Sequence, residues 1–214
     1  MLISREKKLL FIHIQKTAGT SFATELRKKL PDVEEVLGTH SPALKGIEFM
    51  GDEWDSFYKI AFVRNPWDRL VSFYSMIIQH GKRLPWYRLL LAKALKRPYN
   101  LKWQYVLTHS RSFEEFIRNC AHATSKSGWK AFLFNQVDYL TDAQGEIRVD
   151  YIGRFETLSA DVKKISQHLD LNLELLPRLN ASDHKDYREY YNEETRDIVE
   201  KRFHKDVERF KYSF

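Results

Sequence analysis

Cysteine is almost absent from this chain of 214 residues, which contains only Cys120. A single cysteine cannot form an internal disulfide and excludes a zinc site built from cysteine pairs, so the composition favours a reducing compartment. Glycine and proline are also scarce, with eight and six residues, which excludes collagen-like and linker-dominated chains. Disorder as the main state is excluded as well, because 43% of the residues are hydrophobic and 14% are aromatic.

Long apolar runs are missing too. The start of the chain, residues 1–8, is charged and contains no apolar core of a signal peptide, and no run elsewhere approaches the length of a membrane span. We therefore expect a soluble, cytoplasmic protein. No repeat, low-complexity tract or linker divides the sequence, so we expect one domain over residues 1–214.

Acidic residues are missing between residues 70 and 113, where eight basic residues lie. This block carries more positive charge than the net charge of the whole chain, +6, so the charge is concentrated rather than spread. Such a block favours a local anionic partner over a DNA-binding face, and we expect no nucleic-acid partner. A solvated basic helix is the alternative. The eight residues are Lys82, Arg83, Arg88, Lys93, Lys96, Arg97, Lys102 and Arg111.

Short apolar runs alternate with helical patterns along the chain. Strands are expected over residues 9–14, 59–63 and 149–155, an extended segment over 134–140, and a turn over 142–145. Helices are expected over residues 20–30, 66–79, 112–120, 158–169 and 193–209. This alternation predicts an α/β fold, a three-layer sandwich with a central parallel sheet. Ligands of such sheets bind beyond the carboxyl ends of the strands, where residues 15–21 and 64–72 begin.

The segment after the first expected strand, residues 15–21, has the composition of an anion-binding loop. Its small residues let backbone N–H groups converge, the following helix contributes its positive end, and Lys16 adds a full charge. Thr20 or Ser21 is suited to cap that helix. A plain helix cap explains the hydroxyl residues but not the lysine. A nucleoside-triphosphate loop is excluded, because the single Gly19 follows the lysine and no glycine precedes it.

The segment after the second expected strand begins with Arg64 and reaches Ser72 about two turns into a helix. Arg64 offers a fork of donors that matches a phosphate in bidentate fashion, and Ser72 adds a small donor. A capped helix with a surface arginine is the alternative. Two such motifs, in this order and at the ends of two expected strands, favour a binding site.

These motifs resemble those of the PAPS-dependent carbohydrate sulfotransferases. Residues 11–21, FIHIQKTAGTS, resemble the 5′-phosphosulfate loop of that family, and residues 64–72, RNPWDRLVS, resemble its 3′-phosphate motif. Gln15 stands where the family usually has proline, which removes no donor. Within the family, the motifs resemble those of the bacterial enzymes similar to heparan 2-O- and chondroitin/dermatan sulfotransferases. The likeness continues over residues 151–156, 176–182 and 190–195, and it is weakest over 81–130.

The resemblance implies a P-loop-like sulfotransferase fold. It also implies in-line transfer of a sulfuryl group from 3′-phosphoadenosine 5′-phosphosulfate (PAPS) to an acceptor hydroxyl, with adenosine 3′,5′-bisphosphate (PAP) as product and no metal. Lys16 would stabilise the charge that develops on the leaving phosphate, and Arg64 would bind the 3′-phosphate. Arg154 would contact the nucleotide or form a structural salt bridge with Glu156 or Asp150. The implied donor-binding residues are Lys16, Thr17, Ala18, Gly19, Thr20, Ser21, Arg64, Ser72 and Arg154.

An acceptor hydroxyl has to lose a proton, and histidine is the side chain suited to that task near neutral pH. The family carries its base histidine between the two motifs in an H-x-x-A-like setting, which His40-Ser-Pro-Ala43 fits. His40 also follows a short apolar run that predicts another strand end. We therefore expect His40 to be the base, and His13 to be packed in the sheet.

The expected acceptor region is the basic segment from about residue 81 to 130. Its aromatic and basic side chains between Lys82 and Lys102 suit a glycan, or an anionic membrane surface that presents a lipid-linked sugar at its inner face. Two other functions stay open. A nucleotide-dependent phosphotransferase shares the strand–loop–helix arrangement but requires a Gly-Lys-Ser/Thr that the chain lacks, and a non-catalytic polyanion-binding module would keep the loop as a scaffold.

Overall fold

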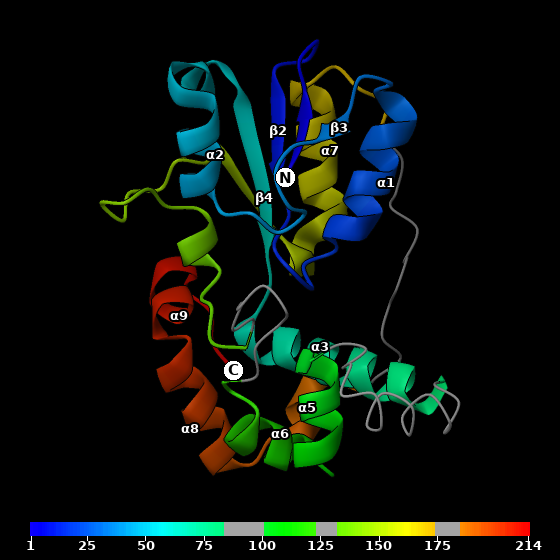
Figure 1. Ribbon diagram of the computed structural model, residues 1–214, viewed down its shortest axis with the longest axis vertical. Coiled ribbons are helices and arrows are strands. Elements are labelled where there is room, and N and C mark those ends of the chain that lie inside the picture. Colours follow the sequence, from blue (N-terminus) through cyan, green and yellow to red (C-terminus); the bar gives the residue numbers. More distant parts are fainter. Residues whose placement is uncertain (84–100, 123–131, 174–184) are drawn as a thin grey trace. The chain divides into compact units, whose positions relative to one another are not determined.

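The computed structural model describes residues 1–83, 101–122, 132–173 and 185–214 (Figure 1). Contacts within the chain group it into two compact units, and each is described by itself. The first consists of Met1–Asn65 and Asn135–Ala181, and the second of Pro66–Phe134 and Ser182–Phe214. The single domain over residues 1–214 therefore stays a prediction. Much of the expected acceptor region over residues 81–130 lies outside the described residues.

The first unit is built on a five-stranded sheet with the strand order β3-β1-β2-β4-β5. Three strands run parallel to one another: β2 (Leu9–Ile12), β4 (Tyr58–Val63) and β5 (Tyr151–Arg154). The other two, β1 (Leu2–Ser4) and β3 (Glu34–Glu35), pair antiparallel, β1 with both β2 and β3. The prediction of a parallel sheet is thus wrong at the edge formed by β1 and β3, and the fold is mixed α/β. The reason is that the short turn over residues 5–8 can join β1 to β2 only as antiparallel neighbours.

One hydrophobic cluster joins the sheet to two helices of the first unit, α1 (Gly19–Lys29) and α7 (Leu158–His168) (Figure 1). Phe11 of β2 contributes to it from the sheet, Phe22 from α1 and Ile165 from α7, and all three are fully buried. Both β2 and β4 are buried along nearly their whole length, as the apolar runs predict for parallel strands. Helix α2 (Ala43–Met50) and the 3₁₀ helix η1 (Gly51–Ser56) lie between β3 and β4 along the chain.

The extended segment expected over residues 134–140 is wrong, since it holds the 3₁₀ helix η2 (Val137–Tyr139). The reason is that the buried Gln136 side chain, rather than a backbone ladder, bonds the end of β4. The turn over 142–145 is confirmed: Asp142 Oδ1 accepts from the backbone N–H of Gln144 and Glu146, and Gly145 has φ 85°. A further 3₁₀ helix, η3 (Phe155–Thr157), follows β5.

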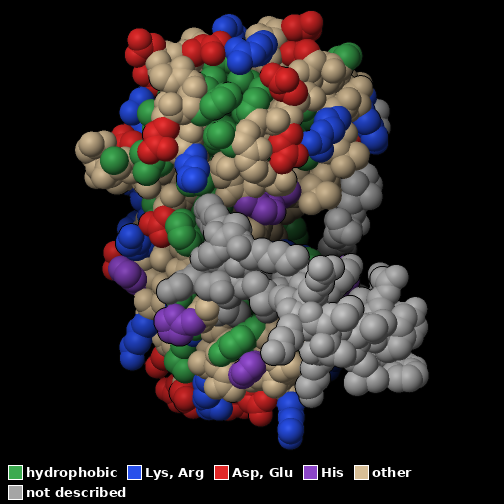
Figure 2. Space-filling model, viewed as in Figure 1, with side chains coloured by type: hydrophobic (Ala, Val, Ile, Leu, Met, Phe, Trp, Pro, Cys, Tyr) green, Lys and Arg blue, Asp and Glu red, His purple; other side chains and the backbone are tan. Residues whose placement is uncertain are grey.

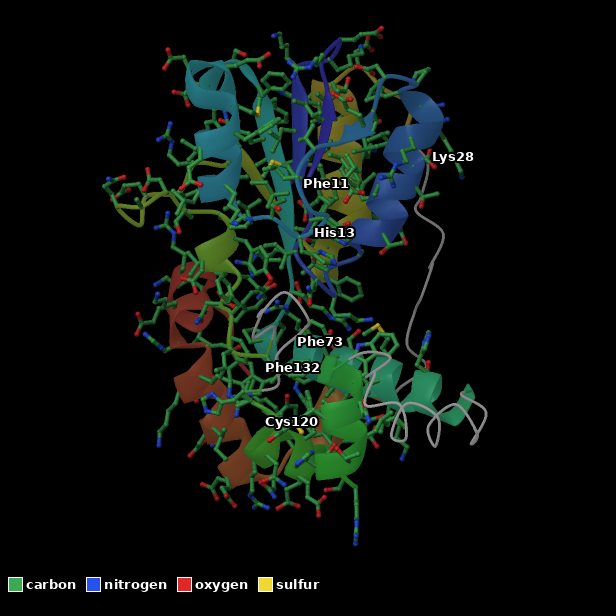
Figure 3. All side chains as sticks on the ribbon, in the orientation of Figure 1. Phe11, His13, Lys28, Phe73, Cys120 and Phe132 are labelled. Atoms are coloured by element: carbon green, nitrogen blue, oxygen red, sulfur yellow. The ribbon has the colours of Figure 1, made fainter. Side chains whose placement is uncertain are left out.

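The described residues of the second unit form helices. They are α3 (Pro66–Arg83), α5 (Leu101–His109), α6 (Phe113–Asn119), η4 (Tyr187–Tyr190), α8 (Glu193–Arg202) and α9 (His204–Phe210). The helix expected over residues 193–209 is thus two helices, separated at the buried Phe203. Aromatic contacts fill the core, among them Phe73 against Phe132 (Figure 3) and Phe116 against Phe132. No helix in the described ranges is both long and apolar enough to cross a membrane.

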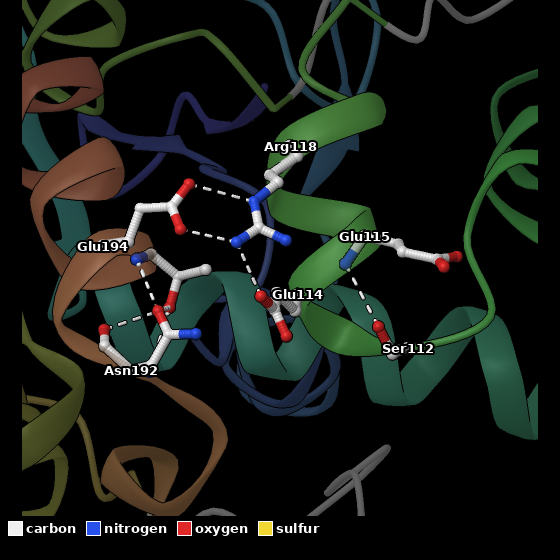
Figure 4. A network of polar contacts seen from close by, with 7 residues as sticks. Ser112, Glu114, Glu115, Arg118, Asn192 and Glu194 are labelled. Carbon is white, nitrogen blue, oxygen red and sulfur yellow. Dashed lines mark hydrogen bonds and ion pairs between the residues drawn. The ribbon is translucent and has the colours of Figure 1, made fainter.

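Side-chain caps and an ion-pair network define the ends of α6 and α8 (Figure 4). Ser112 Oγ accepts from the N–H of Glu115 at the start of α6, and Asn192 forms a capping box with Thr195 at the start of α8. Arg118 of α6 binds Glu194 of α8 through two hydrogen bonds of 3.0 and 2.5 Å. Since these groups are exposed, we attribute the stability of this contact mainly to the buried rings.

Candidate functional site

Helix α1 begins without a side-chain cap from any described residue. The residue before it, Ala18, has a left-handed backbone with φ 67°, and the first turn contains no acidic residue. The expected cap from Thr20 or Ser21 is therefore wrong. The N–H groups of the first turn and the positive end of the helix dipole favour an anion at the start of α1. On the face of the first unit shown in Figure 2, basic and acidic side chains are interspersed.

The loop before α1 has an unusual backbone. Lys16 and Ala18 both have left-handed φ values, 69° and 67°, which non-glycine residues rarely adopt. The hydroxyl of Thr17 is buried and donates to the carbonyl of Ile14 at 2.9 Å, so it closes the loop rather than facing a ligand. Such strained residues cluster at ligand-binding sites, where the surrounding contacts hold them in place.

Gly19 is required by the close approach of another side chain. A Cβ atom on this residue would lie 1.9 Å from Cδ2 of His13, well inside the distance of van der Waals contact. His13 follows strand β2 directly and is 7% exposed, as expected for a residue packed in the sheet. The histidine ring thus lies against the first residue of helix α1.

Arg64 follows the end of β4, and three groups hold it. Its backbone N–H and C=O bond the side-chain amide of Gln136, at 2.9 and 2.7 Å. Its guanidinium lies over the ring of Phe155, 3.9 Å from the centroid, and Nη1 donates to the carbonyl of Lys16 at 3.2 Å. Both expected cations therefore meet at the carboxyl ends of β2 and β4. Gln136 belongs to no motif that sequence reasoning found, and Phe155 lies in the 151–156 segment that resembles the family but was given no role there.

The surroundings of Lys16 disfavour its protonated form. Burial of the side chain, and next the positive charge of Arg64, lower the pKa of Lys16 to about 8. Both effects destabilise the protonated form of Lys16, and a bound anion would stabilise that form. Two partly or fully buried cations beside an uncapped helix end are chemically suited to bind a phosphate or sulfate group.

His40 lies in the loop between β3 and α2, not at a strand end as expected, because β3 stops at Glu35. Two sets of bonds order this loop. The amino nitrogen of Met1 donates to the carbonyls of Gly38 and Thr39, at 2.8 and 3.1 Å. Nδ1 of His40 lies 2.9 Å from the carbonyl oxygen of His13, and the two imidazole rings are 4.6 Å apart. The structure therefore brings His40 beside the residue that contacts Gly19.

Two further expected residues belong to other elements. Arg154 ends strand β5, and its backbone N–H donates to Asp161 Oδ2 at 2.9 Å. Asp150, one of its expected ion-pair partners, pairs with Lys59 Nζ at 3.0 Å. Ser72 belongs to the second unit, where it is buried in α3, so its role in binding stays a prediction. No cluster of three metal-ligating side chains occurs within the described ranges.

Comparisons with known proteins agree with this chemistry. The model of the Sulfotransferase family matches residues 1–213. An uncharacterized protein of Archaeoglobus fulgidus is 27% identical over 136 residues, which cover 63% of this chain and 86% of that protein. Carbohydrate sulfotransferase 10 of Rattus norvegicus is 30% identical over 117 residues, and that of Mus musculus 29%. These alignments cover 51% of this chain but only 32% of either relative. No solved structure matches.

Proposed function

The chain belongs to the sulfotransferase family, and on this premise we propose that it transfers a sulfuryl group from PAPS to a hydroxyl of a glycan or lipid-linked sugar. We further propose that the mixed α/β fold is the P-loop-like, three-layer fold that the sequence motifs imply. The observation that carries the proposal is the meeting of Lys16, Arg64 and the uncapped start of α1 within one unit.

The donor fits these residues because it carries anionic groups at both ends of its ribose. When bound, PAPS supplies an activated sulfuryl group whose departure leaves negative charge on the 5′-phosphate. Lys16 and the backbone N–H groups of residues 17–21 would hold that phosphate and stabilise its charge. Arg64, with Ser72 and Arg154 as further contacts, would hold the 3′-phosphate. None of these contacts requires a metal ion.

His40 is proposed as the base that takes the proton of the acceptor hydroxyl. A carbonyl oxygen can only accept a hydrogen bond, so the contact with His13 requires the proton of neutral His40 on Nδ1. Nε2 then carries no proton, so its lone pair is the one that would accept the proton of the acceptor hydroxyl. This tautomer is the one a general base needs, and it supports His40 over a purely structural role.

A carbohydrate acceptor is proposed because matched relatives are carbohydrate sulfotransferases by name. Heparan, chondroitin and dermatan chains are the first acceptors to test, since the motifs resemble the sulfotransferases of those glycans. The binding groove is proposed to involve the basic segment from Lys82 to Lys102. Placement at the inner face of a membrane belongs to the same proposal, with a lipid-linked sugar as the acceptor.

Thermal unfolding with PAP, ADP and ATP, without metal, tests the donor site. PAP at tens of its dissociation constant should raise the free energy of unfolding by about 2 kcal/mol. The increase should vanish in Lys16→Ala and Arg64→Ala, and persist in Lys163→Ala, which changes an exposed lysine of α7. Transfer of labelled sulfate from PAPS to the three glycans then tests the reaction.

Two other results would replace the proposal. Stabilisation by ATP that depends on magnesium would favour a phosphotransferase. No stabilisation by any nucleotide, with binding of heparin retained, would favour a non-catalytic polyanion-binding module.

A further inference from the structure

His13 contacts both the start of helix α1 and His40. Its ring lies against Gly19 at the start of α1, stacks on Phe11 with centroids 5.7 Å apart, and meets the ring of His40 edge to face. Figure 3 labels Phe11, on β2, and His13, which follows the end of that strand. A buried residue next to a strand end is held in place, so it can fix the positions of both a loop and a second side chain.

The backbone of His13 selects the tautomer of His40, as the 2.9 Å contact with Nδ1 shows. A hydrogen bond alone leaves the imidazole ring free to rotate about that bond. The His13 ring, at 4.6 Å and an interplanar angle of 70°, restricts this rotation from one side. Orientation of Nε2 therefore depends on the side chain of His13 as well as on its carbonyl.

The His13 ring is neutral at the near-neutral pH at which His40 would act as a base. Burial is the main reason, and the neighbouring His40, the amino group of Met1 and Arg27 add to it, so that the pKa of His13 falls to about 3. With so low a pKa, the His13 ring is too weak a base to compete with His40 for the acceptor proton. It also adds no third full charge beside Lys16 and Arg64.

We propose that His13 is a positioning residue, which links the donor loop to the base by buttressing Gly19 on one side and orienting the imidazole of His40 on the other. This inference rests on the proposed function of His40. It assigns His13 no contact with either substrate, so His13 acts on the reaction through His40.

Two substitutions separate the ring from the carbonyl. His13→Ala removes the ring, His13→Phe keeps a flat neutral ring, and both keep the carbonyl. We expect His13→Ala to lower kcat by about tenfold to a hundredfold, because misplacing a catalytic group costs rate rather than binding. Affinity for PAP should change far less than kcat, and His13→Phe should retain most of the activity. An unchanged kcat in His13→Ala would overturn the inference.

The tautomer of His40 gives a readout that needs no turnover. Two-bond proton–nitrogen correlation spectra of histidine-labelled protein, assigned with His40→Gln, report which ring nitrogen carries the proton. We expect the Nδ1–H form in the wild-type protein and in His13→Phe, and a mixture with the Nε2–H form in His13→Ala. An Nε2–H form in the wild-type protein overturns the inference. The expected tautomers without sulfuryl transfer would support the positioning role and reject the proposed reaction.

Discussion

The side-chain amide of Gln136 bonds both the N–H and the C=O of Arg64, at 2.9 and 2.7 Å, in a fully buried position. At the end of β4, these two bonds take the place of the backbone hydrogen bonds that a neighbouring strand would form. The geometry therefore fixes the backbone of the arginine that is proposed to read the 3′-phosphate.

Gln136→Ala should destabilise the protein and weaken PAP binding together. The substitution leaves a buried donor and a buried acceptor unsatisfied, which we expect to lower the free energy of unfolding by about 2–4 kcal/mol. Denaturant unfolding measures this change. Gln167→Ala, on the exposed face of α7, serves as the control and should have little effect. Equal stability of the two variants would contradict the role of the clamp.

The pKa of Lys16, lowered to about 8, predicts how PAP affinity depends on pH. An anion binds the protonated lysine, and the free protein loses this proton as pH rises through the pKa. Affinity should therefore be highest below about pH 8 and fall by up to tenfold per pH unit above it. Titration calorimetry between about pH 7 and pH 9.5 measures the slope, which Lys16→Arg should abolish because arginine stays charged. A slope that persists in Lys16→Arg would assign the titration to another group.

Gly19→Ala should destabilise the protein only while the His13 ring is present. The added Cβ would lie 1.9 Å from that ring, and overpacking of this kind costs about 1–3 kcal/mol. In a His13→Ala background the same substitution should cost far less, which denaturant unfolding of the double-mutant cycle measures. Gly38→Ala is the control, since its nearest neighbour would be Ser41 Oγ at 3.6 Å. Additive costs at Gly19 and His13 would show that the two residues do not press on each other.

Phe155→Leu should reduce the preference for PAP over ADP. The ring lies under the guanidinium of Arg64, and loss of such a contact costs about 1 kcal/mol, or roughly fivefold in affinity. ADP lacks the 3′-phosphate, so its binding should change little. Competitive binding of the two nucleotides measures the ratio, with Phe49→Leu, an exposed residue of α2, as the control. Equal losses for both nucleotides would place Arg64 away from the 3′-phosphate.

The strands and helices that sequence reasoning located are those with a strong local pattern. Continuous apolar runs mark β2 and β4, and apolar residues at helical spacing mark α1 and α7. The strand expected just before His40 is only the short edge strand β3, which pairs over two residues, both glutamates. Without an apolar face, nothing local distinguishes such a strand from a turn, and its pairing with β1 alone defines it.

The two predicted binding motifs were also found through their local pattern, whereas the contacts between them were not. Lys16 and Arg64 were predicted because each belongs to a short segment whose composition suits an anion after a buried strand. Their contact joins residues 48 positions apart, and the clamp on Arg64 joins residues 72 positions apart. Sequence spacing carries no information on such pairs, since strand order decides which loops meet.

By itself the sequence determined the family, the buried strands and the two segments proposed to bind anions, because each rests on a local pattern of residues. Only the tertiary structure decided that Gln136 and Phe155 hold Arg64, that Thr17 closes its own loop, and that His13 lies between Gly19 and His40. These relationships arise when parallel strands β2, β4 and β5 bring their carboxyl ends to one edge of the sheet. The chemistry of the site is local, whereas its geometry is a property of the assembled sheet.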